Sequence, residues 1–201
     1  FLAKEMGFPI DRLLVATNEN DILARFFATG EYARGDVHFT LSPAMDIQVA
    51  SNFERFLYYY FDKDTVQLNA FMHSFSSQGR ATLDGPPDVD FMQATAVNSK
   101  QTLAAVKHVH DQFDYVLDPH TAVGYAACQV FRQSVDAPLV CVATAHPAKF
   151  PEAVKQAAAD AQANHPTLDA LIGLPAKKQV IPATIEAVKK VISEQVKGRS
   201  A

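Results

Sequence analysis

The sequence predicts an α/β protein in which helices flank a parallel β-sheet. Two kinds of pattern lead to this prediction. Continuous apolar runs at 13–16 and 138–145 have the length and composition of strands that are buried on both faces. Segments with helical spacing of apolar residues, several of them preceded by capping residues, lie between and after these runs. Strands that alternate with helices are typical of parallel sheets.

The first elements follow from helix-ending residues and from one buried run. Residues 1–6 have the pattern of a final helical turn, because Gly7 suits a C-terminal cap and Pro9 stops a helix. The elements expected next are a strand over 13–16, a helix over 22–29 with Asn20–Asp21 before it and Gly30 after it, and a possible strand over 37–41.

Two helices and a loop are expected in the middle of the chain. Ser51 and Glu54 have the spacing of a capping box, which predicts a helix that starts there. Its apolar face consists of Phe53, Phe56, Leu57 and Tyr60. A second helix is expected over 64–76, and the Gly85-Pro-Pro sequence predicts a loop over 80–90.

Capping residues also define the second half. Asn98 and Gln101 form another box-like start, and Asp118 precedes a proline in the position that helices favour. The elements expected are helices over 99–113 and 120–134, a strand over 138–145, an alanine-rich helix over 151–163 and a last helix over 185–196.

So few strands leave the sheet incomplete. A parallel sheet needs both faces covered and usually has more strands than two or three. Either the fold is mostly helical with a small sheet, or the remaining strands belong to sequence before Phe1. Because residues 1–6 look like the end of a helix that began earlier, we expect the second alternative, a chain that lacks its N-terminal half.

Composition excludes several classes of protein. A net charge of -4 gives no reason to expect nucleic-acid binding. The apolar runs are too short to cross a bilayer, and no signal-peptide pattern is present. Cys128 and Cys141 lack metal-ligand spacing and suit two buried, reduced thiols in a cytoplasmic protein. We therefore expect a cytoplasmic protein with no metal, no membrane and no nucleic-acid partner.

Polar residues follow both apolar runs. In open α/β sheets, ligands bind beyond the carboxyl ends of the strands. Thr144 lies at that end of the run 138–145, and Thr17, Asn18 and Asn20 follow the run 13–16. These side chains either face a ligand crevice or serve as ordinary turn and cap residues.

Four stretches of the sequence carry a resemblance to a known family. They are ATNENDIL (16–23), LSPAMDIQVASNFERFL (41–57), LDPHTAVGYAA (117–127) and ATAHPAKFPEAV (143–154). In this order and at this spacing they resemble consecutive blocks of threonine synthase, a pyridoxal-phosphate enzyme. The resemblance covers nearly the whole chain, is loosest over 60–115, and maps to roughly the last half of the family.

The resemblance implies a fold, a cofactor and a reaction. The fold is the tryptophan-synthase-β-like fold, or fold type II of the pyridoxal-phosphate enzymes. Within it, 1–59 and 117–201 would belong to the cofactor-binding α/β domain, and 60–116 would be a helical segment or insertion. The family uses pyridoxal 5'-phosphate to convert O-phosphohomoserine and water to L-threonine and phosphate. Thr144 matches the family's threonine beside the pyridine nitrogen, whereas the Schiff-base lysine and the glycine-rich phosphate loop would precede Phe1.

No catalytic residue is therefore expected in this chain, which would supply one wall of a site completed by its missing N-terminal half. Candidate substrate-binding residues are Asn52, Arg55, Asp46, His146 and Lys149. Each has a structural alternative: a cap for the asparagine, a solvated or paired arginine, a turn or ion pair for the aspartate, and a braced loop for the last two. His120 is expected to pack at a helix start.

Two alternatives to threonine synthase remain open. One is a related phospho-lyase that acts on other phosphorylated amino alcohols or acids. The other is a non-catalytic truncated fragment that folds and binds but carries out no reaction.

Overall fold

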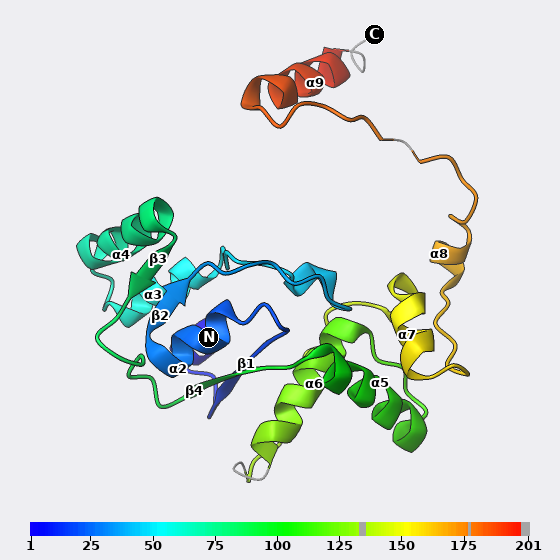
Figure 1. Cartoon of the computed structure of the whole chain (residues 1–201), viewed down its shortest axis with the longest axis horizontal. Helices are drawn as coiled ribbons and strands as arrows, with labels where there is room; N and C mark the ends of the chain where they lie inside the picture. Colours follow the sequence, from blue (N-terminus) through cyan, green and yellow to red (C-terminus); the bar gives the residue numbers. More distant parts are fainter. Residues whose placement is uncertain (133–135, 177, 198–201) are drawn as a thin grey trace. The chain divides into compact units, whose positions relative to one another are not determined.

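The computed structural model describes residues 1–132, 136–176 and 178–197. The chain divides into two units, residues 1–165 and 166–201 (Figure 1). The first unit contains a parallel pair of strands, β1 (Leu13–Thr17) and β4 (Met92–Ala96), in a register that pairs Leu13 with Met92. It also contains an antiparallel pair, β2 (Glu31–Ala33) and β3 (Arg80–Thr82). The predicted combination of parallel strands and helices is confirmed.

Most predicted helices are present. In the first unit they are α1 (Leu2–Glu5), α2 (Ile22–Thr29), α3 (Phe53–Tyr60), α4 (Thr65–Gln78), α5 (Ser99–Phe113), α6 (Pro119–Phe131) and α7 (Pro151–Ala157), with short 3-10 turns at Pro43–Met45 and Pro147–Lys149. The second unit contains α8 (Pro166–Asp169), which was not predicted, and α9 (Ile185–Lys197). Helix α7 ends well before the predicted residue 163, and residues 133–134 of the predicted helix 120–134 lie outside the described residues. None of the described helices is long and apolar enough to cross a membrane.

The predicted helix caps are partly correct. Asn98 and Gln101 form the expected capping box at α5, and the Asp118 side chain caps α6. The box at Ser51 is wrong, because α3 begins at Phe53 and no side chain caps it. Its N-cap residue, Asn52, has helical backbone angles, whereas a capping side chain reaches the next amides from an extended residue.

Two predicted strands are absent from the described residues. Segment 37–41 is irregular because side chains occupy its backbone groups: Asn20 bonds both the N–H and the C=O of His38, and Asp46 accepts the N–H of Thr40. Segment 138–145 pairs with no described strand, and Val140 and Val142 are exposed. Apolar composition alone does not make a strand when no ladder partner is available.

Three strands of the structure were not predicted, because they are short or ordinary in composition and are defined by their pairing partners. β2 and β3 are three residues each, and β3 lies inside the segment predicted as a loop over 80–90. β4 has the unremarkable sequence MQATA and exists because it pairs with β1 along its whole length. Segment 60–116 therefore contains two strands as well as helices, and the domain boundaries at 59 and 116 stay a prediction.

The two largest hydrophobic cores described in the first unit differ in composition. An aromatic core joins α2, α3, α4 and the β2–β3 pair, with Phe26 and Leu57 0% exposed. Within it the ring centroids of Phe26 and Phe53 are 4.7 Å apart, and Ala50 N–H donates to the Tyr32 hydroxyl. The second core, between α5 and α6, is built of smaller side chains: Ala105, Val106, Val109, Leu117 and Ala122.

The cap of α4 predicts a pH dependence of stability. Asp64 accepts from the backbone N–H groups of Val66 and Gln67, and these bonds, that from Gln67 first, lower the pKa of its carboxyl. A lowered folded-state pKa contributes stability that is complete above the unfolded-state pKa of about 4 and is lost as pH falls through the folded-state pKa. Asp64→Asn keeps a capping oxygen but does not ionise. We expect the urea midpoint of the native sequence to exceed that of the variant near neutral pH and the difference to shrink in acid. A difference that does not change with pH would contradict this role.

Candidate functional site

The site is organised around the first turn of α6. Asp118 is only 1% exposed, and its backbone is extended, as an N-cap requires. Its Oδ1 accepts the backbone N–H of His120 at 2.9 Å and that of Thr121 at 3.4 Å. Pro119 occupies the first helical position, where a missing N–H costs nothing. The carboxylate is thus buried but well supplied with donors.

His120 connects this turn to a distant loop. Its Nδ1 lies 2.9 Å from Asp118 Oδ1, and because a carboxylate only accepts, Nδ1 carries the proton. Nε2 is then free to accept, and it does so from the Ala44 N–H at 3.2 Å. The ring is 8% exposed and packs against Phe150 at 4.7 Å between centroids, so the expected packing role is confirmed.

Thr121 makes the second connection. Its hydroxyl donates to Asp118 Oδ2 and accepts the Thr144 N–H at 3.3 Å. The backbone of Thr144 is therefore fixed to α6 across 23 residues of sequence. The Thr144 side chain is exposed, and its hydroxyl forms no hydrogen bond with another described residue. We call the set Asp118, His120, Thr121, Ala44 and Thr144 the Asp118 network.

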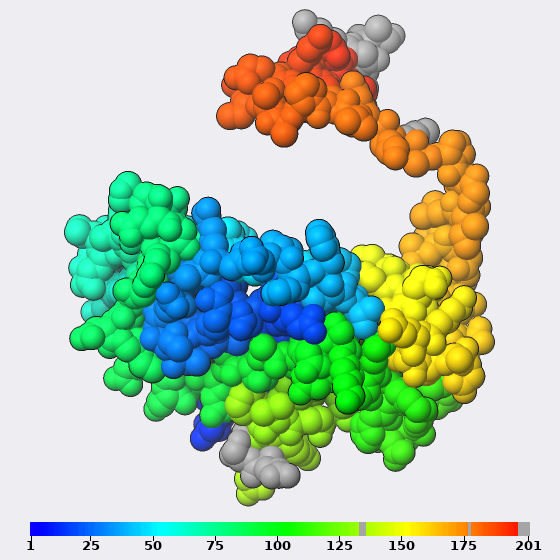
Figure 2. All heavy atoms as spheres, viewed as in Figure 1, coloured from blue at the N-terminus to red at the C-terminus, as the bar shows by residue number. Residues whose placement is uncertain are grey.

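The loop that contains Ala44 is held from its other side by the residues that follow β1. Asp46 accepts from Asn18 Nδ2 at 2.7 Å, Asn20 Nδ2 at 3.1 Å and Thr40 Oγ1 at 2.7 Å. Asn18 and Asn20 are each 2% exposed. Among the described residues, the hydrogen-bond partners of this carboxylate are all uncharged, so its contacts support a loop-shaping role. Figure 2 shows the surface of this loop, in light blue, bordering the yellow residues near 150.

His146 and Lys149 follow Thr144 in the same segment. His146 Nδ1 accepts the Ala148 N–H at 3.2 Å, and its ring lies 5.0 Å from that of His165. Lys149 Nζ lies 5.9 Å from the centroid of the Phe150 ring. Both side chains are exposed. These contacts brace the turn before α7 and leave the charged end of Lys149 open to solvent.

Asn52 and Arg55 lie elsewhere, at the start of α3. Both are exposed, and neither side chain has a hydrogen bond or ion pair to another described residue. Asn52 is therefore not a side-chain cap, and Arg55 is solvated and not ion-paired with any described residue, which is one form of its structural alternative. Arg55 lines a hollow of about 480 Å³ together with Leu2, Ser51, Glu54, Tyr58, Tyr59 and Leu68. No described contact joins this hollow to the Asp118 network.

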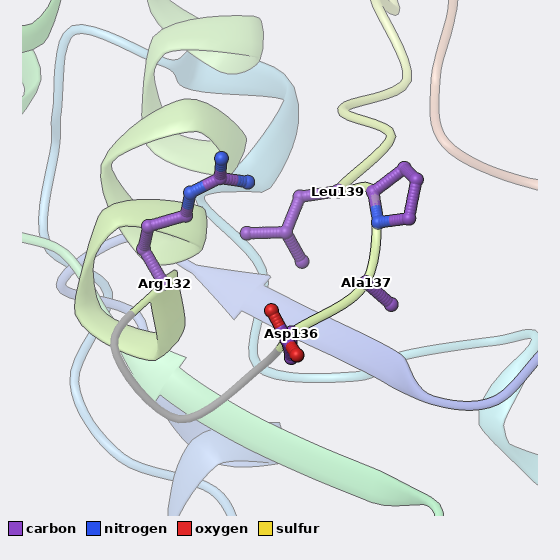
Figure 3. Close-up of a pocket in the computed structure, with 5 residues that line it drawn as sticks. Arg132, Asp136, Ala137 and Leu139 are labelled. Carbon is purple, nitrogen blue, oxygen red and sulfur yellow. The ribbon is translucent and has the colours of Figure 1, made fainter.

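A larger hollow does not include any predicted site residue. It has a volume of about 660 Å³ and is lined by Arg132, Asp136, Ala137, Pro138 and Leu139 (Figure 3). Figure 3 shows Arg132 at the end of α6 and the remaining side chains on the segment that follows. No described cluster of three or more His, Cys, Asp or Glu side chains is suited to a metal ion.

The sequence identified Thr144 but not the residues that hold it. Thr121 was not singled out, although it stands three residues after the capping Asp118, where a hydroxyl can reach the cap carboxylate. The Thr121–Thr144 and His120–Ala44 bonds join residues far apart in sequence, and no local pattern predicts them. Together they connect three of the four stretches singled out in the sequence.

Comparison with known proteins gives a consistent result. The family described as threonine synthase, C-terminal, matches residues 121–192. The threonine synthase of Corynebacterium glutamicum is 36% identical over 210 residues, which cover 99% of this chain and 43% of that protein. The threonine synthase of Pseudomonas aeruginosa is 38% identical over 160 residues, covering 78% of this chain and 34% of that protein.

The crystal structure of pyridoxal-phosphate-bound threonine synthase from Brucella melitensis has a TM-score of 0.84 and 34% sequence identity to this chain. It covers 96% of this chain, and the chain covers 42% of it. The chain therefore spans less than half of the length of these proteins, and over that length the likeness in fold confirms the predicted α/β class.

Removing one hydroxyl tests the Asp118 network. Thr121→Val keeps the shape of the side chain but leaves the Thr144 N–H and one Asp118 oxygen without their partner. We expect a loss of about 1–3 kcal/mol in the free energy of unfolding, measured in urea, because a buried acceptor loses a bond. Amide hydrogen exchange at Thr144 should become faster.

The exposed Thr65 provides the matched control, as Thr65→Val changes the same atoms away from the network. Equal effects of the two substitutions, or unchanged exchange at Thr144, would show that the Thr121 hydroxyl does not hold this segment.

Proposed function

This chain corresponds to the C-terminal portion of threonine synthases, and on that premise we propose that it forms one wall of the active site of a pyridoxal-phosphate-dependent lyase. The reaction proposed for the whole enzyme is the conversion of O-phosphohomoserine and water to L-threonine and phosphate. The observation that carries the proposal is the Asp118 network, which joins three family-like stretches and leaves the Thr144 hydroxyl exposed at its edge.

Thr144 fits a contact to the cofactor ring. Its backbone is anchored by Thr121, while its hydroxyl has no partner among the described residues and is accessible. A hydroxyl can donate to a pyridine nitrogen or accept from it without bringing a charge. When bound, pyridoxal phosphate supplies an electron sink for loss of the substrate α-proton. A neutral partner would hold the ring in place without forcing its nitrogen to stay protonated, as a carboxylate would.

Arg55 and Asn52 are the proposed contacts for an anionic group of the substrate. Both side chains are exposed and carry no described partner, so their donors remain available. A guanidinium can bind a phosphate or carboxylate through two parallel N–H bonds. Glu54 lines the same hollow and would oppose an anion there, so the arginine must carry most of the attraction.

Of the other candidates, two have exposed side chains available to a ligand and one is engaged in contacts within the protein. Lys149 and His146 follow Thr144 directly and are exposed, which suits binding of the substrate phosphate or carboxylate from the same edge. Asp46 meets uncharged donors only. We propose that it shapes the loop around Ala44 and does not orient a cationic substrate-binding side chain.

The remaining machinery is expected from the part of the enzyme that this chain does not span. The resemblance implies that the Schiff-base lysine and the loop for the cofactor phosphate lie there.

Val140 is 83% and Val142 is 74% exposed, although their segment has the composition of a buried strand. Burial of these side chains against the remainder of the enzyme would turn this segment into the strand that the sequence predicts.

The proposed contact is tested in the full-length enzyme by Thr144→Val. At matched cofactor occupancy we expect phosphate release from O-phosphohomoserine to slow by an amount equivalent to about 1–3 kcal/mol in the activation barrier, because one hydrogen bond to a buried ring is lost. Thr65→Val serves as the control and should leave the rate unchanged. An unaltered rate in the Thr144 variant would refute the contact, and faster release from other phosphorylated amino alcohols than from O-phosphohomoserine would favour the phospho-lyase alternative.

A second prediction concerns the chain by itself. Because no lysine here matches the family's Schiff-base motif, we expect the isolated chain to acquire no stoichiometric cofactor and to release no phosphate from O-phosphohomoserine. Incubation with pyridoxal phosphate, borohydride reduction and peptide mapping would measure this. Complete labelling of one lysine at a cofactor concentration that leaves the others unlabelled would contradict it.

A further inference from the structure

The two cysteines of the chain lie on facing elements. Cys141 Sγ donates to the Thr121 carbonyl oxygen at 3.7 Å, and a Cβ placed on Gly124 would lie 3.1 Å from the same sulfur. Thr121, Gly124 and Cys128 are three and four residues apart on α6 and therefore share one face of the helix. The Cys141 sulfur thus lies on the face where Cys128 follows one turn later.

The two side chains are also close enough to interact, since each cysteine shifts the pKa of the other. Burial raises the pKa of both thiols, and the neighbouring Cys128 and the charge of Asp118 raise the pKa of Cys141 further. The neighbouring Cys141 partly opposes this shift at Cys128. Both cysteines are free and only partly buried, so small reagents have access to them.

We propose that Cys128 and Cys141 form a reversible intramolecular disulfide, and that low-molecular-weight disulfides are the class of reagent that oxidises them. The Cys128 thiolate attacks one sulfur of the reagent, whose S–S bond breaks to release one reagent thiolate and leave a mixed disulfide. The Cys141 thiolate then attacks the Cys128 sulfur and expels the second reagent thiolate. The protein loses two protons and two electrons, and the reagent disulfide is reduced to two thiols.

The bond would restrain the segment that carries Thr144. This segment has no strand partner among the described residues, and the described hydrogen bonds that hold it to α6 are those of Cys141 and of the Thr144 N–H to Thr121. A covalent link three residues before Thr144 would limit its motion relative to α6. The oxidation state of the pair would then set how firmly Thr144 is positioned. The disulfide itself does not rest on the proposed function.

The raised pKa values predict how oxidation depends on pH. Thiolates are the reacting species, so disulfide formation should be slow near neutral pH and accelerate as pH rises towards the pKa of the thiols. The charged group that acts on this pair from the start of α6 is Asp118.

The test uses the 201-residue chain and oxidised glutathione as the probe. We expect non-reducing mass spectrometry to find a Cys128–Cys141 cross-linked peptide pair, with no retained glutathione, and dithiothreitol to reverse it. In the Cys128→Ser and Cys141→Ser variants, the reaction should stop at the mixed disulfide between glutathione and the remaining cysteine. Retention of glutathione on both cysteines of the native sequence, or cross-links only between chains, would overturn the proposal.

Amide hydrogen exchange tests whether the disulfide restrains the segment that carries Thr144. Exchange at Thr144 should slow in the oxidised native sequence and stay unchanged in either serine variant treated in the same way. Formation of the disulfide without any change at Thr144 would overturn the positioning effect.

Discussion

One buried carboxylate organises the candidate site. Asp118 meets two backbone N–H groups, the His120 imidazole and the Thr121 hydroxyl, so nearly all of its acceptor capacity is used inside the protein. A carboxylate this deeply buried is tolerated only when donors replace the water it has lost. The same requirement fixes the orientation of its partners. His120 must present its unprotonated nitrogen to Ala44, and Thr121 must present an oxygen lone pair to Thr144.

The geometry of the proposed active-site wall follows from that constraint. The loop around Ala44 is held on one side by His120 and on the other by Asp46 with Asn18 and Asn20. The backbone of Thr144 is held by a hydrogen bond to the Thr121 hydroxyl. Among the described residues, no other hydrogen bond joins the backbone of this segment to α6. Backbone anchoring leaves the Thr144 hydroxyl available, which is the condition for a side chain that contacts a ligand. The weaker attachment of this segment also explains why a disulfide next to it would matter.

Local rules predicted what depends on neighbouring residues. The Asn98–Gln101 box, the Asp118 cap and Gly30 at the end of α2 were predicted because a few residues decide each of them. Strands depend on partners that are distant in sequence. β4 was missed because its own composition is ordinary. Segment 138–145 forms no strand with the described residues, because its apolar composition indicates burial without identifying a partner.

In the candidate site, too, local patterns predicted single residues but not the tertiary contacts between them. Thr144 was singled out from its place after an apolar run and from its family-like stretch, whereas its anchor Thr121 and the Ala44–His120 bond arise from tertiary contacts that no spacing encodes. Asp46 was a candidate substrate-binding residue with a turn or ion-pair role as its structural alternative, and its contacts to amides and a hydroxyl favour the turn role.

The most direct measurement of the central claim is residue-resolved amide hydrogen exchange in Asp118→Ser. Serine keeps an oxygen that caps α6 but is too short, with one oxygen, to hold both His120 and Thr121. If Asp118 organises the site, the Ala44 and Thr144 amides should both exchange faster in this variant, while the amides paired between β1 and β4 keep their protection. Unchanged exchange at Ala44 and Thr144 would mean that the two segments are held independently of the buried carboxylate, and the account would be wrong.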